Sequence, residues 1–150
     1  MMQRNQDLVA EKSVAKVHQK VIVHADGGAR KNPGPAAVGI VIFDEQYNEL
    51  TCYKECIGDT TNNVAEYKAL IKGLELSAKL TRGEVHVFMD SELVINQING
   101  YYRIKADHLF PLFQEVKNAE RPFKKVVYTS VPRTNRFQEK ADRLVNDALG

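Results

Sequence analysis

Four carboxylates stand at positions from which a folded chain could bring them together. Asp26 and Asp90 each close an apolar stretch with the composition of a buried strand, VIVHA and EVHVFM. Glu66 lies in the first turns of a predicted helix, and Asp142 lies beside the apolar stripe of the last predicted helix. If the two strands are neighbours, we expect all four side chains to approach one edge of the sheet.

Such a cluster needs a cation, because two like charges ~4 Å apart repel by ~4 kcal/mol at an effective dielectric constant of about 20. Oxygen ligands without cysteine suit Mg²⁺ or Mn²⁺. Two such ions ~3.5–4 Å apart can activate a water and stabilise the leaving oxygen when a phosphodiester is displaced. The four residues together therefore favour metal-dependent chemistry on a phosphodiester.

Each carboxylate also has an ordinary structural interpretation when it is taken alone. Asp90 and Ser91 are suitable residues for capping a helix. Glu66 would favour the positive end of a helix dipole, and Asp142 would be a normal charge at the edge of an amphipathic face. Asp26 is harder to explain in this way, since two glycines follow it. A structural domain whose acidic residues are only caps therefore remains one alternative.

The order of elements predicts an α/β domain with one mixed five-stranded sheet. Strand-like segments over 20–26, 36–45 and 50–58, joined by short links, predict an antiparallel meander. Two more strands are expected over 84–90 and 123–131. A helix of about 17 residues is expected after cap-type residues at 59–62, stopped near 81–83. Further helices are expected over 91–99, over 107–120 with Asp107 as its cap, and over 139–149. The resulting order, βββαβααβα, places helices against a single sheet.

Length and composition indicate one compact domain in the 150-residue chain. We expect this domain over 20–150, after a polar tail over 1–19 that lacks the apolar centre of a signal peptide. No apolar run approaches the ~20 residues that cross a bilayer, so no membrane partner is expected. Cys52 and Cys56 would lie about 13 Å apart on a strand, too far for a disulfide. Free thiols fit a cytoplasmic protein.

Four segments resemble type 1 ribonuclease H, in the compact form common in archaea and many bacteria. They are HADGGARKNPGPAAVG, TTNNVAEYKAL, FMDSELVINQING and KADRLVNDAL, and they occur in the family's order. The resemblance covers about residues 20–149 and implies the ribonuclease H-like fold. It also implies an endonuclease that hydrolyses the RNA strand of RNA–DNA hybrids and leaves 5′-phosphate and 3′-hydroxyl ends.

By position, the resemblance implies that the catalytic ligands of two Mg²⁺ or Mn²⁺ ions, with substrate bound, are Asp26, Glu66, Asp90 and Asp142. Gly27 and Gly28 would let the nucleic-acid backbone come close. Three asparagines would contact RNA 2′-hydroxyls or nearby backbone: Asn32, Asn62 and Asn63. Thr61 would lie in a pocket for a DNA phosphate. For Asn62 and Asn63, helix capping is the alternative role.

Two features depart from the family pattern. The loop VPRTNRFQEKAD has no His where some members place one, and Arg133 or Arg136 can replace its charge but not act as a base. The segment NGYYRIKADHLF is too short for the basic handle that other relatives insert between the middle helices. His24, two residues before Asp26, is expected to pack in the core or support the site from behind, rather than to take part in catalysis.

Charge agrees with a nucleic-acid partner once the proposed ligands are set aside. The formal net charge is +2, from 21 basic and 19 acidic residues, of which 15 remain without the four ligands. Basic residues that could follow the hybrid are Lys31, Arg103, Lys105, Lys124, Lys125, Arg133 and Arg136. We expect a monomer that acts on RNA–DNA hybrid, with double-stranded RNA left open as a further substrate. A non-catalytic nucleic-acid-binding module of the same fold is the alternative.

Overall fold

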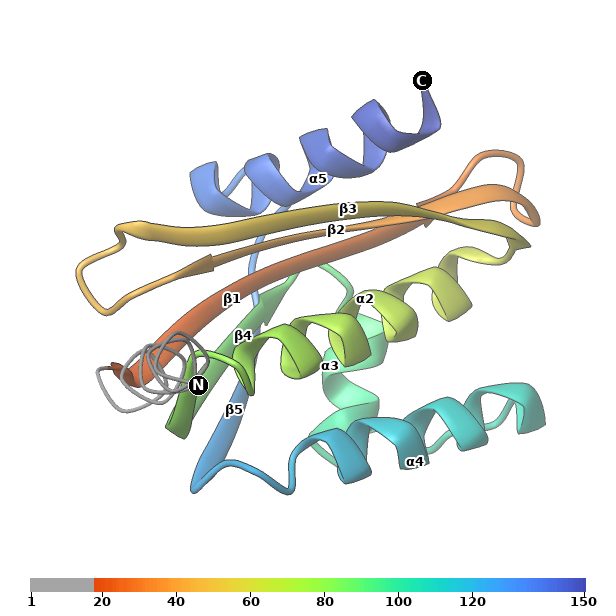
Figure 1. Ribbon diagram of the computed structural model, residues 1–150. Coiled ribbons are helices and arrows are strands. Elements are labelled where there is room, and N and C mark those ends of the chain that lie inside the picture. The colour runs from red at the N-terminus through yellow and green to blue at the C-terminus, as the bar shows by residue number, and fades with distance from the viewer. Residues whose placement is uncertain (1–17) are drawn as a thin grey trace, which may run out of the picture.

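A computed structural model describes residues 18–150 of the chain, which form one five-stranded sheet with flanking helices (Figure 1). The strands are β1 (His18–Ala29), β2 (Gly34–Phe43), β3 (Glu49–Thr60), β4 (Thr81–Met89) and β5 (Lys125–Ser130). The helices are α2 (Asn62–Ser77), α3 (Glu92–Ile98), the 3₁₀ helix η1 (Asp107–Leu109), α4 (Phe110–Ala119) and α5 (Arg136–Leu149). The predicted α/β class and element order are confirmed.

The sheet is mixed, and its strands lie in the order β3-β2-β1-β4-β5. β1, β2 and β3 form the predicted antiparallel meander. β4 runs parallel to β1, and β5 runs parallel to β4. β1 is therefore the central strand, with β2 on one side and β4 on the other.

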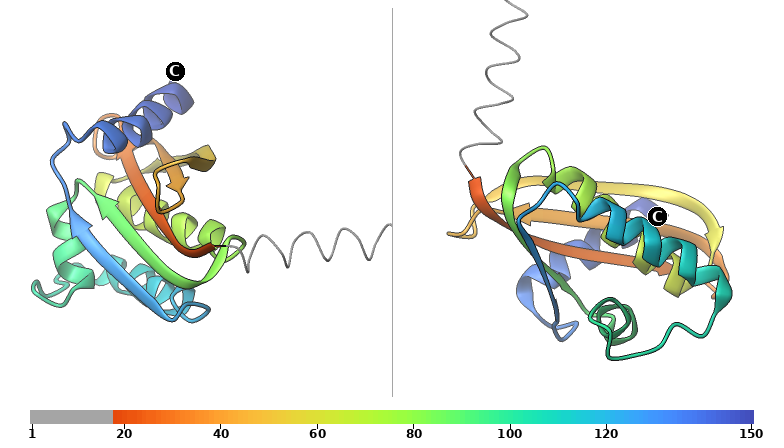
Figure 2. Two further views of the ribbon diagram at one scale, coloured as in Figure 1. Left: turned by 90° about the vertical axis from the view of Figure 1, so that its left-hand side faces the viewer. Right: turned by 90° about the horizontal axis from the view of Figure 1, so that it is seen from below.

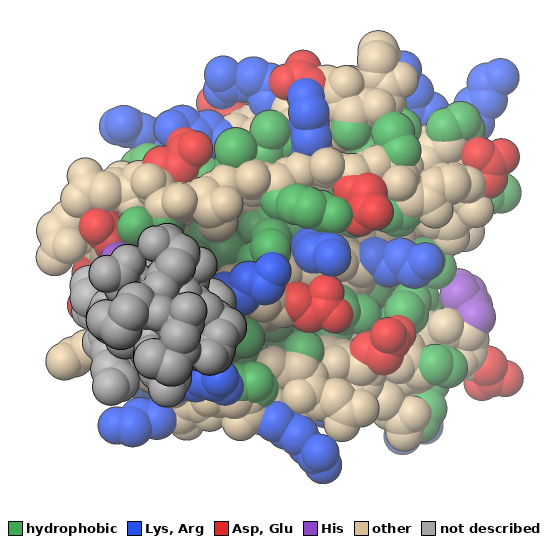
Figure 3. Space-filling model, in the orientation of Figure 1, with side chains coloured by type: hydrophobic (Ala, Val, Ile, Leu, Met, Phe, Trp, Pro, Cys, Tyr) green, Lys and Arg blue, Asp and Glu red, His purple; other side chains and the backbone are tan. Residues whose placement is uncertain are grey.

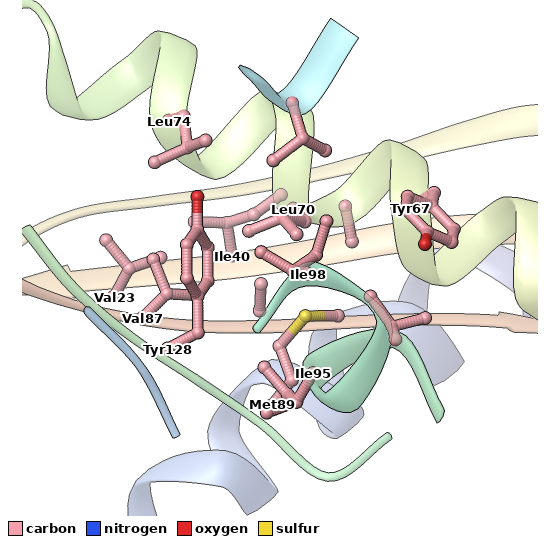
Figure 4. Packing of buried hydrophobic residues seen from close by; sticks show 14 of the residues in the cluster. Val23, Ile40, Tyr67, Leu70, Leu74, Val87, Met89, Ile95, Ile98 and Tyr128 are labelled. Atoms are coloured by element: carbon pink, nitrogen blue, oxygen red, sulfur yellow. The ribbon is translucent and has the colours of Figure 1, made fainter. Parts of the chain in front are cut away.

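Helices cover both faces of the sheet, but unequally. α2, α3 and α4 lie on one side, and α5 alone lies on the other (Figures 1 and 2). The side of α2 holds the main apolar core, in which Val23 and Ile40 of the sheet pack with Leu70 of α2 (Figure 4). The side of α5 holds a smaller cluster built on Ile22, Val41 and Phe43, against which Phe137 and Leu144 of α5 pack.

Alternation along β1 divides its residues between these two faces. Val21, Val23 and Ala25 belong to the main core. Ile22 belongs to the smaller cluster, and His24 and Asp26 follow it on the side of α5. Asp26 thus lies on the face that only one helix covers.

Side-chain caps begin three of the helices. Thr61 accepts a hydrogen bond from the backbone N–H of Val64 at 3.2 Å and caps α2. Ser91 accepts from Val94 at 3.3 Å and caps α3, so this cap does not use Asp90. Asn135 caps α5. The prediction that Asp107 caps the next helix was wrong, since residues 107–109 form η1 and α4 begins at Phe110 without a side-chain cap.

β1 does not end at Asp26, as the sequence suggested, but continues to Ala29. Pairing with β2 extends it, because Asp26 lies opposite Gly39 and Ala29 lies opposite Ala36. Pairing with β4, in contrast, stops at His24 and Phe88. Beyond that pair β1 and β4 separate, and Asp26 lies just past the point of separation.

The predicted polar tail lies outside the described residues except for its last two, His18 and Gln19, which belong to β1. Cys52 and Cys56 are exposed free thiols, as predicted. Among residues 18–150, no helix combines the length and the apolar character needed to cross a membrane.

Candidate functional site

One surface hollow of about 770 Å³ is lined by all four of the carboxylates that the sequence singled out. Asp26 comes from β1 and Asp90 follows the end of β4, the parallel neighbour of β1. Glu66 comes from α2 and Asp142 from α5, which lie on opposite faces of the sheet. The opening between β1 and β4 is thus where side chains from both faces meet.

Two glycines let α2 and α5 pack closely on the strands β1 and β2. A Cβ atom added to Gly27 would lie 2.1 Å from the carbonyl oxygen of Ala65, so the backbone of α2 rests directly on β1 beside Glu66. A Cβ atom added to Gly39, the partner of Asp26 in the sheet, would lie 2.4 Å from the carbonyl oxygen of Ala141. The absence of side chains at these positions brings Glu66 and Asp142 towards Asp26 from the two faces.

The carboxylate of Asp26 is held in an environment that disfavours its charge. Burial, first, and the charges of Asp90, Asp142 and Glu66 together raise the pKa of Asp26 to about 8. A hydrogen bond that protonated Asp26 donates to Asp142 acts in the same direction. Without a cation, the folded protein therefore favours the protonated form of Asp26.

Glu66 shares this environment but has a polar partner. Burial raises the pKa of Glu66 to about 7, and the charge of Asp90 acts in the same direction. The hydroxyl of Ser91 donates a hydrogen bond to Glu66 Oε1 at 3.0 Å and opposes the rise. Ser91 thus caps α3 and orients Glu66, a second role that the sequence analysis missed.

Two further side chains contact the carboxylates from the rim. Arg133 Nε lies 3.8 Å from Asp90 Oδ2, and the Arg133 side chain is 80% exposed. Such an exposed pair contributes little stability. Asn146 donates from Nδ2 to Asp142 Oδ2 at 3.4 Å. Its position one turn after Asp142 was the available sequence signal for this contact.

The chemistry of these donors fits a hard divalent cation. All four are carboxylates, and a cation would relieve the repulsion that raises the pKa of Asp26 and Glu66. Within residues 18–150, no three His, Cys, Asp or Glu side chains already stand close enough to enclose an ion. The side chains would therefore have to draw together when an ion binds.

Asn32 and Asn62 shape the rim of the hollow through their carbonyl oxygens. Asn32 Oδ1 accepts from the backbone N–H of Asn62 at 2.9 Å, and Asn62 Oδ1 accepts from the N–H of Ala29 at 2.8 Å. These bonds tie the loop after β1 to the start of α2. The capping alternative for Asn62 and Asn63 was wrong, because Thr61 is the cap and both asparagines lie in the first turn of α2.

The other predicted substrate residues divide into two groups. Gly27, Gly28, Asn63 and Arg133 line the hollow together with the two asparagines. Thr61 and Arg136 do not line it. Thr61 is engaged as the cap of α2, and the Arg136 guanidinium lies over the ring of Phe137 at 4.9 Å.

His24 packs behind the site. It is buried and stacks on Phe88 with ring centroids 4.9 Å apart, which agrees with the expected packing role. The pKa of His24 is lowered to about 4, chiefly by burial. The hydrogen bond with Gln138 raises this pKa, and the charge of His86 lowers it. Gln138 is fully buried between α5 and β1, and the sequence analysis did not single it out.

The surface charge is mixed where it can be seen. On the face shown in Figure 3, Lys and Arg side chains alternate with Asp and Glu side chains. The excess of basic over acidic residues is therefore not spread evenly over that face. The predicted cationic path has to be sought around the hollow, where Arg30 and Arg133 lie.

Comparison with known proteins gives a consistent result. Residues 24–148 match the protein-family model described as reverse transcriptase-like. The bifunctional protein Rv2228c of Mycobacterium tuberculosis is 41% identical over 131 residues, which cover 87% of this chain and 35% of that protein. The chain therefore spans about a third of the length of this curated relative, and it spans 64% of the ribonuclease HI of Halobacterium salinarum, with 37% identity.

Solved structures show the same similarity. The N-terminal RNase H domain of Rv2228c superposes with a TM-score of 0.82 at 42% identity, covering 87% of this chain and 99% of that one. RNase H1 of Halobacterium salinarum gives a TM-score of 0.82 at 35% identity, covering 87% and 97%. LC11-RNase H1, solved in complex with an RNA/DNA hybrid, gives 0.78 at 42% identity, covering 85% and 95%.

Proposed function

Because the chain belongs to the type 1 ribonuclease H enzymes, we propose that it hydrolyses the RNA strand of RNA–DNA hybrids. It acts as an endonuclease and leaves 5′-phosphate and 3′-hydroxyl ends. The observation that carries this proposal is the hollow lined by Asp26, Glu66, Asp90 and Asp142, in which burial and the neighbouring carboxylates raise the pKa of Asp26. The similar LC11-RNase H1 was solved with an RNA/DNA hybrid, which supports this substrate.

The four carboxylates would hold two Mg²⁺ or Mn²⁺ ions. When bound, these ions activate the attacking water and stabilise the leaving oxygen of the phosphodiester. Ser91 keeps Glu66 in place and Asn146 keeps Asp142 in place through their hydrogen bonds. Arg133 adds positive charge next to Asp90 but cannot accept a proton.

The rim of the hollow would recognise the RNA strand. Asn32, Asn62 and Asn63 line the hollow, where their amide groups would contact ribose 2′-hydroxyls, and a 2′-hydroxyl distinguishes RNA from DNA. Gly28 leaves room for the backbone of the strand. Thr61 would receive a DNA phosphate and Arg136 would add charge, both beyond the edge of the hollow.

We also infer that residues 20–150 act as one catalytic domain and as a monomer, because a single chain supplies all four carboxylates. The exposed free thiols of Cys52 and Cys56 favour a cytoplasmic location.

The direct test measures cleavage of end-labelled RNA–DNA hybrid, RNA duplex and DNA duplex, with Mg²⁺, with Mn²⁺ and with neither. We expect metal-dependent cuts within the RNA strand of the hybrid, and none when Asp90→Asn replaces the wild type. The RNA-duplex reaction decides whether double-stranded RNA is also a substrate. Binding of hybrid without cleavage in either metal would instead identify a non-catalytic binding module.

A second groove, of about 540 Å³, adjoins the hollow and shares Asn63 and Leu93 with it. Tyr101 and Tyr102 line this groove and are 78% and 51% exposed. Arg103 and Lys105, two of the predicted basic residues, line it as well. Exposed aromatic rings beside cations are suited to hold a nucleic-acid strand by stacking and by phosphate contact.

We predict that changing both Tyr101 and Tyr102 to Ala raises KM for hybrid by roughly 10–100-fold, because stacking contributes about 1–3 kcal/mol per base. The value of kcat should change less than about twofold, since the groove lies outside the carboxylate cluster. Phe110→Ala is the matched control, because Phe110 is also 51% exposed but does not line the groove. Equal KM values for the double variant and the control would show that the groove does not hold substrate.

A further inference from the structure

A buried glutamine bridges α5 and β1 where β1 and β4 separate. The last β1–β4 pair is His24 with Phe88, and Ala25 is the first residue of β1 beyond it. The carbonyl oxygen of Ala25 accepts a hydrogen bond from Gln138 Nε2 of α5 at 2.8 Å. Gln138 is 0% exposed, so no solvent competes for this bond. A side chain from α5 thus satisfies the backbone at the opening of the site.

The orientation of the Gln138 amide follows from its partners. A carbonyl oxygen can only accept, so the NH₂ group must face Ala25 and Oε1 must face His24 Nδ1, which lies 3.0 Å away. His24 Nδ1 therefore carries a hydrogen and donates it. The other ring nitrogen, Nε2, is buried and has no partner among the described residues. The stacking of His24 on Phe88 holds the ring in this position.

The bridge connects the immediate neighbourhoods of two carboxylates. Ala25 precedes Asp26, and Gln138 lies one turn before Asp142 on the same side of α5. The other buried contacts of α5 with the sheet are apolar, through Phe137 and Leu144. Its polar contacts with β3 are exposed: Lys140 pairs with Glu49, and the Cys56 thiol donates to the carbonyl oxygen of Ala148. Apolar contacts are not directional, whereas the two hydrogen bonds of Gln138 allow one rotation and one longitudinal position of the helix.

We propose that Gln138 is a positioning residue for this site. By fixing α5 against β1, it sets the separation of Asp26 and Asp142, and His24 holds the Gln138 amide in the orientation that this requires. The consequence for catalysis rests on the proposed function. The effect of Gln138 on the separation of Asp26 and Asp142 does not depend on the proposed function. It determines how well the metal-free protein binds an ion through these two carboxylates.

The main test compares Gln138→Leu, which keeps the size but removes both hydrogen bonds, with Phe137→Leu as control. Phe137 is the neighbouring residue on α5 and packs in the smaller cluster, with its ring 5.7 Å from that of His24. It makes neither hydrogen bond of Gln138, so Phe137→Leu should lower stability and leave both bonds in place. We expect Gln138→Leu to weaken Mn²⁺ binding, measured by calorimetry without substrate, by roughly 10–100-fold. Phe137→Leu should bind Mn²⁺ within about twofold of wild type. On hybrid, Gln138→Leu should lower kcat and leave KM nearly unchanged.

Two further measurements keep the proposal testable if Gln138→Leu folds poorly. His24→Phe retains stacking but removes the donor to Gln138, and it should weaken Mn²⁺ binding to an intermediate extent. In the wild type, ¹⁵N NMR should place the imidazole hydrogen on His24 Nδ1. A hydrogen on Nε2 would overturn the bridge as described.

The outcomes separate this proposal from the proposed function. If both α5 variants lose Mn²⁺ affinity only in proportion to their loss of stability, Gln138 is a packing residue and the proposal is wrong. If wild type binds Mn²⁺ but does not cleave hybrid, the proposed function fails, whereas the comparison of Mn²⁺ affinities still decides the role of Gln138.

Discussion

Asp26→Asn will abolish hydrolysis of the hybrid and at the same time stabilise the metal-free protein at pH 8. Activity should fall by roughly a thousandfold or more, because the proposed ions would supply several kcal/mol of transition-state stabilisation and Asp26 is one of their proposed ligands. The free energy of unfolding should rise by a few kcal/mol, since each unit of pKa shift corresponds to about 1.4 kcal/mol. Asn keeps the shape of the side chain and removes the buried charge.

The pH dependence of this effect has a definite sign. The pKa of Asp26 is about 8 in the folded protein, far above its value in an unfolded chain. Between about pH 4 and 8 the folded state therefore holds the extra proton, and stability is lost as the pH rises. Glu66, with a pKa of about 7, acts in the same direction. His24 acts in the opposite direction, because its folded pKa of about 4 lies below the unfolded value.

The contribution of His24 is complete by about pH 6.5, so the cleanest measurement compares melting temperatures between pH 6.5 and 8. The metal-free wild type should lose stability over this range, and Asp26→Asn should lose much less. Asp147→Asn is the control, since it removes an exposed carboxylate from α5 and changes net charge equally. Saturating Mg²⁺ should flatten the wild-type dependence by binding the charged form. Identical slopes for all three proteins would show that Asp26 is not held protonated.

The adjacent residues Gly27 and Gly28 should respond very differently to the same substitution. Gly27→Ala places a methyl group 2.1 Å from the carbonyl oxygen of Ala65, a backbone atom of α2 that cannot rotate away. The helix must move, and we expect a loss of about 3 kcal/mol in the free energy of unfolding. Because Glu66 follows Ala65, hydrolysis should fall at least about tenfold even at temperatures where the variant is folded.

Gly28→Ala meets only Val145 Cγ1, at an ordinary distance of 3.7 Å. Its free energy of unfolding should stay within about 0.5 kcal/mol of wild type. Thermal unfolding of the two variants, followed by cleavage assays on hybrid, makes the comparison. Equal stability losses would contradict the packing of α2 on Gly27. A KM increase confined to Gly28→Ala would support the approach of the nucleic-acid backbone at that residue.

Much of this architecture was predictable because local chemistry and tertiary structure agree. Thr61 and Ser91 are typical N-cap residues, and α2 and α3 begin directly after them. The apolar stretches before Asp26 and Asp90 form the adjacent strands β1 and β4. The sequence therefore predicted that the four carboxylates could converge if these strands were neighbours, and the family resemblance favoured this, and all four line one hollow. The prediction of Asp107 as a helix cap was wrong, because α4 begins later and without a side-chain cap. Pro111 fits the first turn of that helix.

The remainder depends on distant parts of the chain. The extension of β1 to Ala29 follows from pairing with β2, which no local property of residues 27–29 indicates. Gln138 stands between Phe137 and Glu139 and has the character of a surface residue. It is buried because α5 lies across the separation of β1 and β4. Gly39 looks like an interruption of a strand, and its role appears only when α5 is placed on it.

The unequal covering of the two sheet faces has a consequence for the cooperativity of the molecule. The main core unites α2, α3 and α4 with the sheet, whereas α5 is held by a small aromatic cluster, the contact at Gly39 and the Gln138 bridge. Because α5 packs on the sheet face opposite the main core, we expect it to open as a separate unit without disturbing that core. The enzyme can therefore lose Asp142, and with it a complete site, while most of its fold persists. We therefore expect activity to be lost on heating when this one helix undocks, before the sheet melts.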